Sequence, residues 1–109
     1  MTLPLFLCRE AETQAGPVRV ISFEIPGGNT TPEEFAKAIS GHRSLFIPSP
    51  GYGLILDGRG PIWGYAMMVH EGHPSAWIGV RDPRLGVVIV ESHGPMATVG
   101  AVVPWPEEA

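Results

Sequence analysis

The sequence predicts one small α/β domain over residues 1–109, with a mixed sheet and two helices, and three observations lead to this class. The length of 109 residues is that of a single domain. The chain is 44% apolar, enough for a core, while 14 Gly and 12 Pro divide it with frequent turns. Strand-like and helix-like apolar patterns alternate along it. Together these features exclude collagen, a long helical bundle and a disordered chain.

The N-terminal segment predicts two strands. Leu3–Cys8 is a short apolar run, and we expect the lone Cys8 to be a small buried thiol that forms no intrachain disulfide. Glu10–Pro17 is polar and predicts a turn. In Val18–Ile25, alternate positions carry the larger apolar residues Ile21, Phe23 and Ile25, and this period of two is typical of a strand. The Pro-Gly-Gly sequence that follows ends it.

A helix is predicted from Thr31 to about Ser40. Thr31 is a suitable N-cap, Pro32 fits the first helical position, and Glu34 completes a capping box. Gly41 ends the helix, and a loop rich in glycine and proline follows.

The second half predicts a strand–helix–strand unit followed by a hairpin. Its helix is apolar nearly all round, so we expect the sheet and a partner subunit to bury it. The expected elements are strand Leu54–Asp57, helix Pro61–Glu71, strand Ala76–Val80, strand Val87–Glu91, a candidate last strand Met96–Val103 and a tail over residues 104–109.

The connections determine which strand ends meet. Two strands joined through a helix run parallel, whereas the short segment from Arg81 to Gly86 requires the next strand to return antiparallel. The two ends of the sheet then lie roughly 17–20 Å apart, the length of a five- or six-residue strand. One end holds Gly58, Arg59, Gly60, Asp82 and Arg84; the opposite end holds His73 and His93, which the hairpin register brings together.

The carboxyl end of the parallel strands is a candidate anion site. Open α/β sheets bind ligands there, and the turn Gly58–Gly60 at a helix start offers backbone N–H groups and a positive dipole end. Arg59 and Arg84 can add bidentate contacts to phosphate. The competing interpretation is structural: Arg59 pairs with Asp57, and Arg84 pairs with Asp82, at the surface.

Histidines supply the other candidate chemistry. His73 and His93 together can serve as a general acid and a general base near neutral pH, and the alternative is two exposed turn histidines. His70 and His73 have a spacing that metal ligands use, but interaction with the helix dipole is the simpler interpretation. We expect Trp63 and Trp77 in the core, because both lie in elements predicted to be buried.

The charge distribution bounds the kind of ligand. The net charge of −4 disfavours binding of a long duplex, yet residues 41–86 carry four arginines against three acidic residues. Any anionic ligand is therefore expected to be small. Only 17% of the residues are charged, which indicates self-association. Neither a membrane-spanning run nor a signal peptide is evident, so we expect a cytoplasmic protein.

The stretch from Asp57 to His93 resembles the CRISPR-associated Csx-three family, the third family of ring nucleases in type III CRISPR systems. GRGPIW and DPRLG are far more specific than an isolated Gly-x-Gly. The matching segments are GRGPIW at 58–63, HP at 73–74, AW at 76–77, DPRLG at 82–86 and SH at 92–93, with GG at 27–28 and TPEE at 31–34 upstream.

The resemblance implies a compact Rossmann-like fold that forms dimers. It also implies binding of cyclic tetra-adenylate, a second messenger, and its manganese-dependent cleavage, which switches off the antiviral response, together with action on the 3′ ends of short RNA. Carried over by position, His73 and His93 would do acid–base work, Asp82 would bind metal or act in catalysis, and Arg84 would bind phosphate. The chemistry stays open between a metal-activated water and attack by the substrate's own 2′-hydroxyl.

Asp82 and His73 are expected at opposite ends of the sheet, so one chain cannot place both on one phosphate. We therefore expect a composite site, in which one dimer holds the ring and a second dimer brings its histidine face onto it. Such a heterologous contact need not close, so tetramers or filaments are expected with ligand. Two other functions remain open: a non-catalytic cyclic-nucleotide sensor or regulatory module, in which the histidines are dispensable, and a structural interaction domain.

Overall fold

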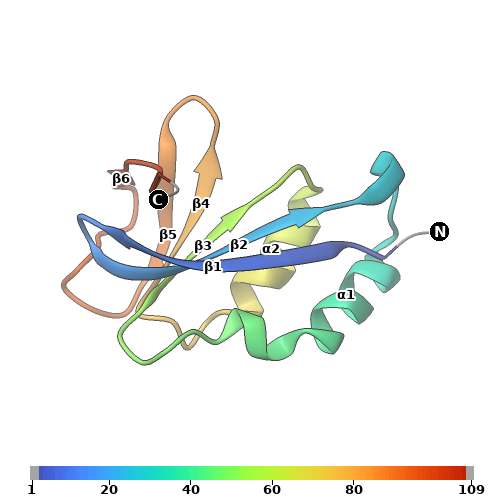
Figure 1. Ribbon diagram of the computed structural model, residues 1–109, viewed down its shortest axis with the longest axis horizontal. Helices are drawn as coiled ribbons and strands as arrows, with labels where there is room; N and C mark the ends of the chain where they lie inside the picture. The colour runs from blue at the N-terminus through green and yellow to red at the C-terminus, as the bar shows by residue number, and fades with distance from the viewer. Residues whose placement is uncertain (1–2, 108–109) are drawn as a thin grey trace.

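The fold is a six-stranded sheet with two α-helices on one face (Figure 1). The computed structural model describes residues 3–107, so the last two residues of the expected tail lie outside this range. Its elements are β1 (Leu5–Thr13), β2 (Gly16–Glu24), the short 3-10 helix η1 (Pro26–Gly28), α1 (Pro32–Gly41), a second 3-10 helix η2 (Arg43–Phe46), β3 (Gly53–Asp57), α2 (Ile62–Glu71), β4 (Trp77–Asp82), β5 (Gly86–Ser92) and β6 (Val102–Val103).

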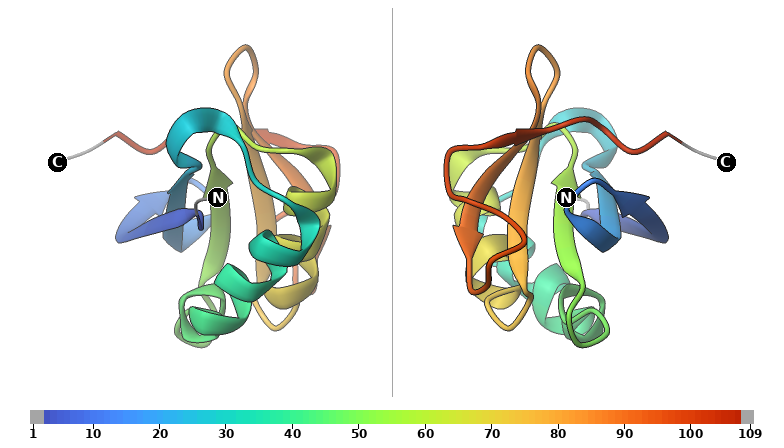
Figure 2. Two further views of the ribbon diagram at one scale, coloured as in Figure 1. Left: turned by 90° about the vertical axis from the view of Figure 1, so that its right-hand side faces the viewer. Right: turned by 90° about the vertical axis from the view of Figure 1, so that its left-hand side faces the viewer.

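The strands follow one another across the sheet in the order β1-β2-β3-β4-β5-β6. β2, β3 and β4 are parallel, and β1, β5 and β6 pair antiparallel with their neighbours. The predicted α/β class, the parallel strand–helix–strand unit and the antiparallel return of β5 are therefore confirmed. Because β2, β3 and β4 are parallel, their carboxyl ends meet at one end of the sheet, where α1 and α2 also start, and both helices lie on the same face (Figure 2).

The two helices start differently. Thr31 caps α1, since its hydroxyl accepts a hydrogen bond from the backbone N–H of Glu34 at 3.1 Å, as the capping box predicts. α2 begins after Pro61, and no side chain caps its N-terminus. The first backbone N–H groups of α2 therefore have no side-chain acceptor within residues 3–107.

Each face of the sheet has its own core. Beneath the helices, Phe35, Ile39 and Met68 pack on apolar residues of β2, β3 and β4. On the opposite face, Trp77 and the β-branched residues of β2 and β5 pack with the C-terminal segment, which crosses that face (Figure 2). Trp105 fixes this segment, because the guanidinium groups of Arg81 and Arg9 lie 4.0 and 5.5 Å from its ring centroid.

For the ends of the chain, one expectation is wrong and two are confirmed only in part. Glu10–Pro17 is not one polar turn, because β1 continues through Thr13 as an edge strand paired only with β2. Cys8 lies on that edge strand and is exposed, so it is not a buried thiol. Within Met96–Val103 only Val102 and Val103 form a strand, while the preceding residues fold as turns that bond back to Ile89.

The surroundings of α2 agree only in part with the expectation of a helix buried on most sides. Gly64 and Met68 are fully covered by this chain. Ile62 is 89% exposed at the start of the helix, where no element of the described chain covers it. Among residues 3–107, no helix has the length and apolar character needed to cross a membrane.

Candidate functional site

The turn Gly58–Gly60 joins β3 to α2 and packs tightly against Phe23. A Cβ atom on Gly60 would lie 2.6 Å from Cε2 of Phe23, and one on Gly58 would lie 2.5 Å from the Phe23 carbonyl oxygen. Both positions therefore require glycine, since any larger residue would displace the turn. The hydroxyl of Tyr65, one turn into α2, donates a hydrogen bond to the carbonyl of Gly58. The turn is thus held from both sides with its N–H groups beside the uncapped helix start.

Tyr65 keeps its proton across the physiological range. Burial is the larger cause and the negative charge of nearby Asp57 the smaller one, and together they raise the pKa of Tyr65 to about 12. The hydroxyl is therefore a permanent donor to the turn rather than a general base.

Arg59 has no carboxylate partner among residues 3–107, so the competing interpretation, in which it pairs with Asp57, is wrong. The carboxylate of Asp57 instead accepts a hydrogen bond from the Ser22 hydroxyl at 3.3 Å and lies 3.5 Å from Nη1 of Arg81. Arg59 is exposed at the middle of the glycine turn. A guanidinium that no carboxylate of the described residues neutralises, beside the backbone N–H groups of a helix start, is suited to bind an anion.

Asp82 and Arg84 lie at the same end, in the hairpin between β4 and β5. Oδ1 of Asp82 accepts hydrogen bonds from the backbone N–H groups of Arg84 at 2.8 Å and Leu85 at 3.2 Å. These bonds, the one from Arg84 first, lower the pKa of Asp82, which stays ionised. Nε of Arg84 lies 3.7 Å from Asp82, so the structural interpretation of this pair is confirmed, while the Arg84 side chain is 87% exposed.

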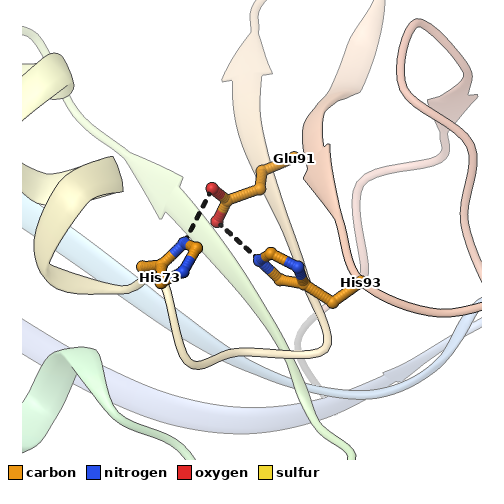
Figure 3. A group of neighbouring side chains, drawn as sticks. All are labelled: His73, Glu91 and His93. Carbon is orange, nitrogen blue, oxygen red and sulfur yellow. Dashed lines mark hydrogen bonds and ion pairs between the residues drawn. The ribbon is translucent and has the colours of Figure 1, made fainter.

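His73 and His93 meet at the opposite end of the sheet, as the hairpin register predicts. Their rings are nearly perpendicular, with centroids 4.7 Å apart. His73 lies in the loop after α2, and His93 follows β5, where its backbone N–H donates to the Ala76 carbonyl at 2.9 Å. Glu91 lies between them: its Oε1 is 3.1 Å from Nδ1 of His73, and its Oε2 is 3.5 Å from Nε2 of His93 (Figure 3).

The two ends are separated by the length of β4. Asp82 is the last residue of this strand, and Ala76, the backbone partner of His93, immediately precedes its first. A strand of that length spans about 20 Å. One chain therefore cannot bring Asp82 or the glycine turn to the same phosphate as His73.

A sequence model of the CRISPR-associated protein family Cas_csx3 matches residues 44–104. The chain belongs to this Csx-three family. A curated relative, an uncharacterized protein of Aquifex aeolicus (strain VF5), is 53% identical over 53 residues, which are 48% of this chain and 48% of the relative. The alignment thus spans about half the length of that relative. The family match includes both the glycine turn and the histidine end of this Csx-three member.

Glu91 is the residue of the histidine end that the sequence analysis missed. It was assigned only as the end of a strand. The sequence did contain one signal for it: Glu91 is two residues before His93, and alternate residues of a strand lie on the same face. The pairing with β4 shifts register between Ile78 and Gly79, and Glu91 then lies opposite Ile78, on the helix-covered face.

The donor set of this trio fits a divalent metal ion such as manganese. Among residues 3–107, His73, Glu91 and His93 are the one group of three metal-ligating side chains whose ligand atoms all lie within 4.8 Å of one another. Imidazole nitrogen and carboxylate oxygen both suit first-row divalent ions. Asp82 belongs to no such group, and one of its oxygens already accepts two backbone bonds. His70 also lies outside the trio, beside the groove between α1 and α2.

Proposed function

We propose that this chain is a metal-dependent phosphodiesterase that binds and linearises cyclic tetra-adenylate and so switches off type III CRISPR signalling. The CRISPR association follows from the family, and the ring substrate from the resemblance of the GRGPIW and DPRLG segments. The observation that supports catalysis, as opposed to binding alone, is the cluster of His73, Glu91 and His93. Two imidazoles converging on one carboxylate are suited to acid–base and metal chemistry, and a pure binding module does not need them. Cleavage at RNA 3′ ends uses the same chemistry.

The carboxyl end of the sheet would hold the ring. Backbone N–H groups of the turn Gly58–Gly60 and the start of α2 would bind a phosphate. The guanidinium of Arg59, which pairs with no carboxylate of residues 3–107, would neutralise it. Arg84 is exposed at the tip of the neighbouring hairpin and would bind a second phosphate. The acidic net charge is no obstacle, because a four-phosphate ring needs only a few local contacts.

The histidine end would supply the reactive groups. Glu91 contacts Nδ1 of His73 and Nε2 of His93, which leaves the opposite nitrogen of each ring able to exchange a proton with the substrate. In the metal-dependent chemistry, the same trio would instead hold manganese, and the ion would supply Lewis-acid stabilisation of the negative charge developing on phosphate. The products distinguish the two chemistries, since water attack leaves a monophosphate and 2′-hydroxyl attack leaves a cyclic phosphate.

A second molecule is needed to complete this site, because the ring-binding end and the histidine end of one chain are about 20 Å apart. We infer that the histidine face of one dimer docks on the ring held by another dimer. This contact joins unlike surfaces and need not close, so ligand-dependent tetramers or filaments are expected.

The dimer itself would form through the apolar groove between α2 and β5. This groove has a volume of about 870 Å³ and contains Ile62, Val80, Val88 and Val90, with Arg59 and Asp82 at its end. Ile62 is 89% and Val90 40% exposed, and together with Val80 and Val88 they form a continuous apolar surface on which a second copy can pack. A second copy across a two-fold axis here would bring two glycine turns together and double the phosphate contacts.

Incubation with cyclic tetra-adenylate, with and without manganese, followed by chromatography of the products, tests the proposal. We expect linear products, and at least a hundredfold lower rates for His73→Ala and His93→Ala, in line with loss of an acid–base group. His42→Ala removes an exposed imidazole outside the trio and should cleave normally. Binding without cleavage under both conditions would instead indicate a sensor, and absence of binding would refute the ligand itself.

A further inference from the structure

A second cavity, of about 800 Å³, lies next to the glycine turn. It opens between the β2–α1 connection and the β3–α2 connection, at the carboxyl ends of two adjacent parallel strands. Its walls include Glu24, Asn29, Thr30, Arg59, Gly60 and Trp63. Arg59 and Gly60 also belong to the candidate phosphate turn, so a ligand group in this cavity would lie next to a phosphate bound on that turn.

One wall of the cavity is aromatic and fixed in place. Trp63 is only partly buried, although the sequence analysis expected it in the core. Its ring meets the buried Phe35 edge to face at 5.8 Å, which holds it at the cavity wall. A planar apolar group of a ligand can therefore pack on it without reorganising the chain.

The other wall carries polar groups that the chain does not use. The Oγ1 atom of Thr30 is buried and has no hydrogen-bond partner among residues 3–107. Asn29 presents an exposed amide, which offers both a donor and an acceptor, and Glu24 presents an exposed carboxylate. The exposed amide and carboxylate can therefore bond a polar group of a ligand in the cavity.

We propose that this cavity binds one adenine base of the ring whose phosphate lies on the turn Gly58–Gly60. The inference rests on the proposed function and names the part of the site that selects the base. A second phosphate is disfavoured here, because Glu24 would repel it. A base with an exocyclic amino group suits the cavity, since the amide of Asn29 and the carboxylate of Glu24 both accept from an amino group and Trp63 packs on the ring.

Calorimetric titration with cyclic tetra-adenylate and with its inosine counterpart tests this assignment. The inosine ring has the same phosphates and riboses but lacks the exocyclic amino group. All proteins carry His73→Ala and manganese is omitted, so that no ring is cleaved during the titration. Asn29→Ala removes the amide of the cavity, and Gln14→Ala is the matched control, because it removes an exposed amide at the opposite end of the sheet.

We expect the parent protein to bind the adenine ring at least tenfold more tightly than the inosine ring. Asn29→Ala should weaken adenine-ring binding about tenfold and remove most of this preference. Gln14→Ala should match the parent, and Arg59→Ala should weaken both rings equally. If the parent binds the ring and Asn29→Ala keeps the parent's preference, the base assignment is wrong while the proposed function stands. If the folded parent binds neither ring, the proposed function fails, and the base assignment with it.

Discussion

The hydroxyl of Tyr65 donates a hydrogen bond to the backbone carbonyl of Gly58, so α2 holds the turn from which it starts. This bond links a partly buried helix residue to the backbone that we propose binds phosphate. The geometry of the turn therefore depends on a side chain that itself need not touch the ligand.

Tyr65→Phe should make the turn Gly58–Gly60 less rigid without leaving a cavity in the core. The ring remains packed against Phe23, and only the hydrogen bond is lost, so we expect about 1 kcal/mol less stability. Binding of cyclic tetra-adenylate should weaken about three- to tenfold. Tyr52→Phe is the control, because its hydroxyl makes no side-chain hydrogen bond within residues 3–107. Equal ring affinity for the two variants would argue against a positioning role for Tyr65.

The raised pKa of Tyr65 predicts a loss of stability at high pH. In the unfolded chain the phenol ionises near pH 10, whereas in the folded chain its pKa is about 12. The folded state therefore holds the proton more tightly, and this contribution to stability is present below pH 10 and disappears as the pH rises to about 12. Urea unfolding at several alkaline pH values should show the decline in the parent protein. In Tyr65→Phe, a decline of the same size would mean that other groups cause it.

Gly60→Ala should displace the turn. Its Cβ would lie 2.6 Å from Phe23, and overpacking of this kind costs about 1–3 kcal/mol. Gly41→Ala is the matched control, because no atom lies within 4 Å of its Cβ and it ends α1 without a left-handed backbone. Thermal unfolding should separate the two variants, and ring affinity should fall only for Gly60→Ala. Similar melting temperatures for both would show that the turn tolerates a side chain.

Ile62→Asp should separate the proposed dimer. Ile62 is 89% exposed in the chain, so a charge there costs the fold little but prevents an apolar groove from closing on a second copy. Leu7→Asp is the control, since Leu7 is 75% exposed on the edge strand β1, away from the groove. Light scattering after gel filtration should give a monomer for Ile62→Asp and a dimer for Leu7→Asp. A dimer in both cases would place the interface elsewhere.

The sequence predicted best those parts of the fold that glycine, proline and helix caps define. Thr31 and Pro32 placed α1, and the short connection before Gly86 gave the antiparallel return that brings His73 and His93 together. β1 was predicted too short, because an edge strand pairs on one side only and can carry polar residues through Thr13. The exposure of Cys8 follows from the same edge position.

The sequence patterns could not predict which side chains pair with one another in the folded chain. Asp57 is two residues from Arg59, yet it pairs with Arg81 of the neighbouring strand, because adjacent parallel strands bring their ends together. Glu91 joins the histidines for a similar reason, since the register shift that orients it is a feature of strand pairing. Such contacts depend on distances across the sheet, which local spacing does not contain.

The composite site is the central claim, and mixing two inactive variants tests it most directly. His73→Ala removes the histidine end. Asp82→Asn removes the carboxylate to which the family resemblance gives a metal-binding or catalytic role, while keeping an oxygen for the N–H groups of Arg84 and Leu85. Each variant alone should cleave cyclic tetra-adenylate very slowly. An equal mixture should recover about a quarter of the parent rate, because one in four random contacts between dimers joins the two intact faces. No recovery at any mixing ratio, with both variants folded and dimeric, would contradict the composite site.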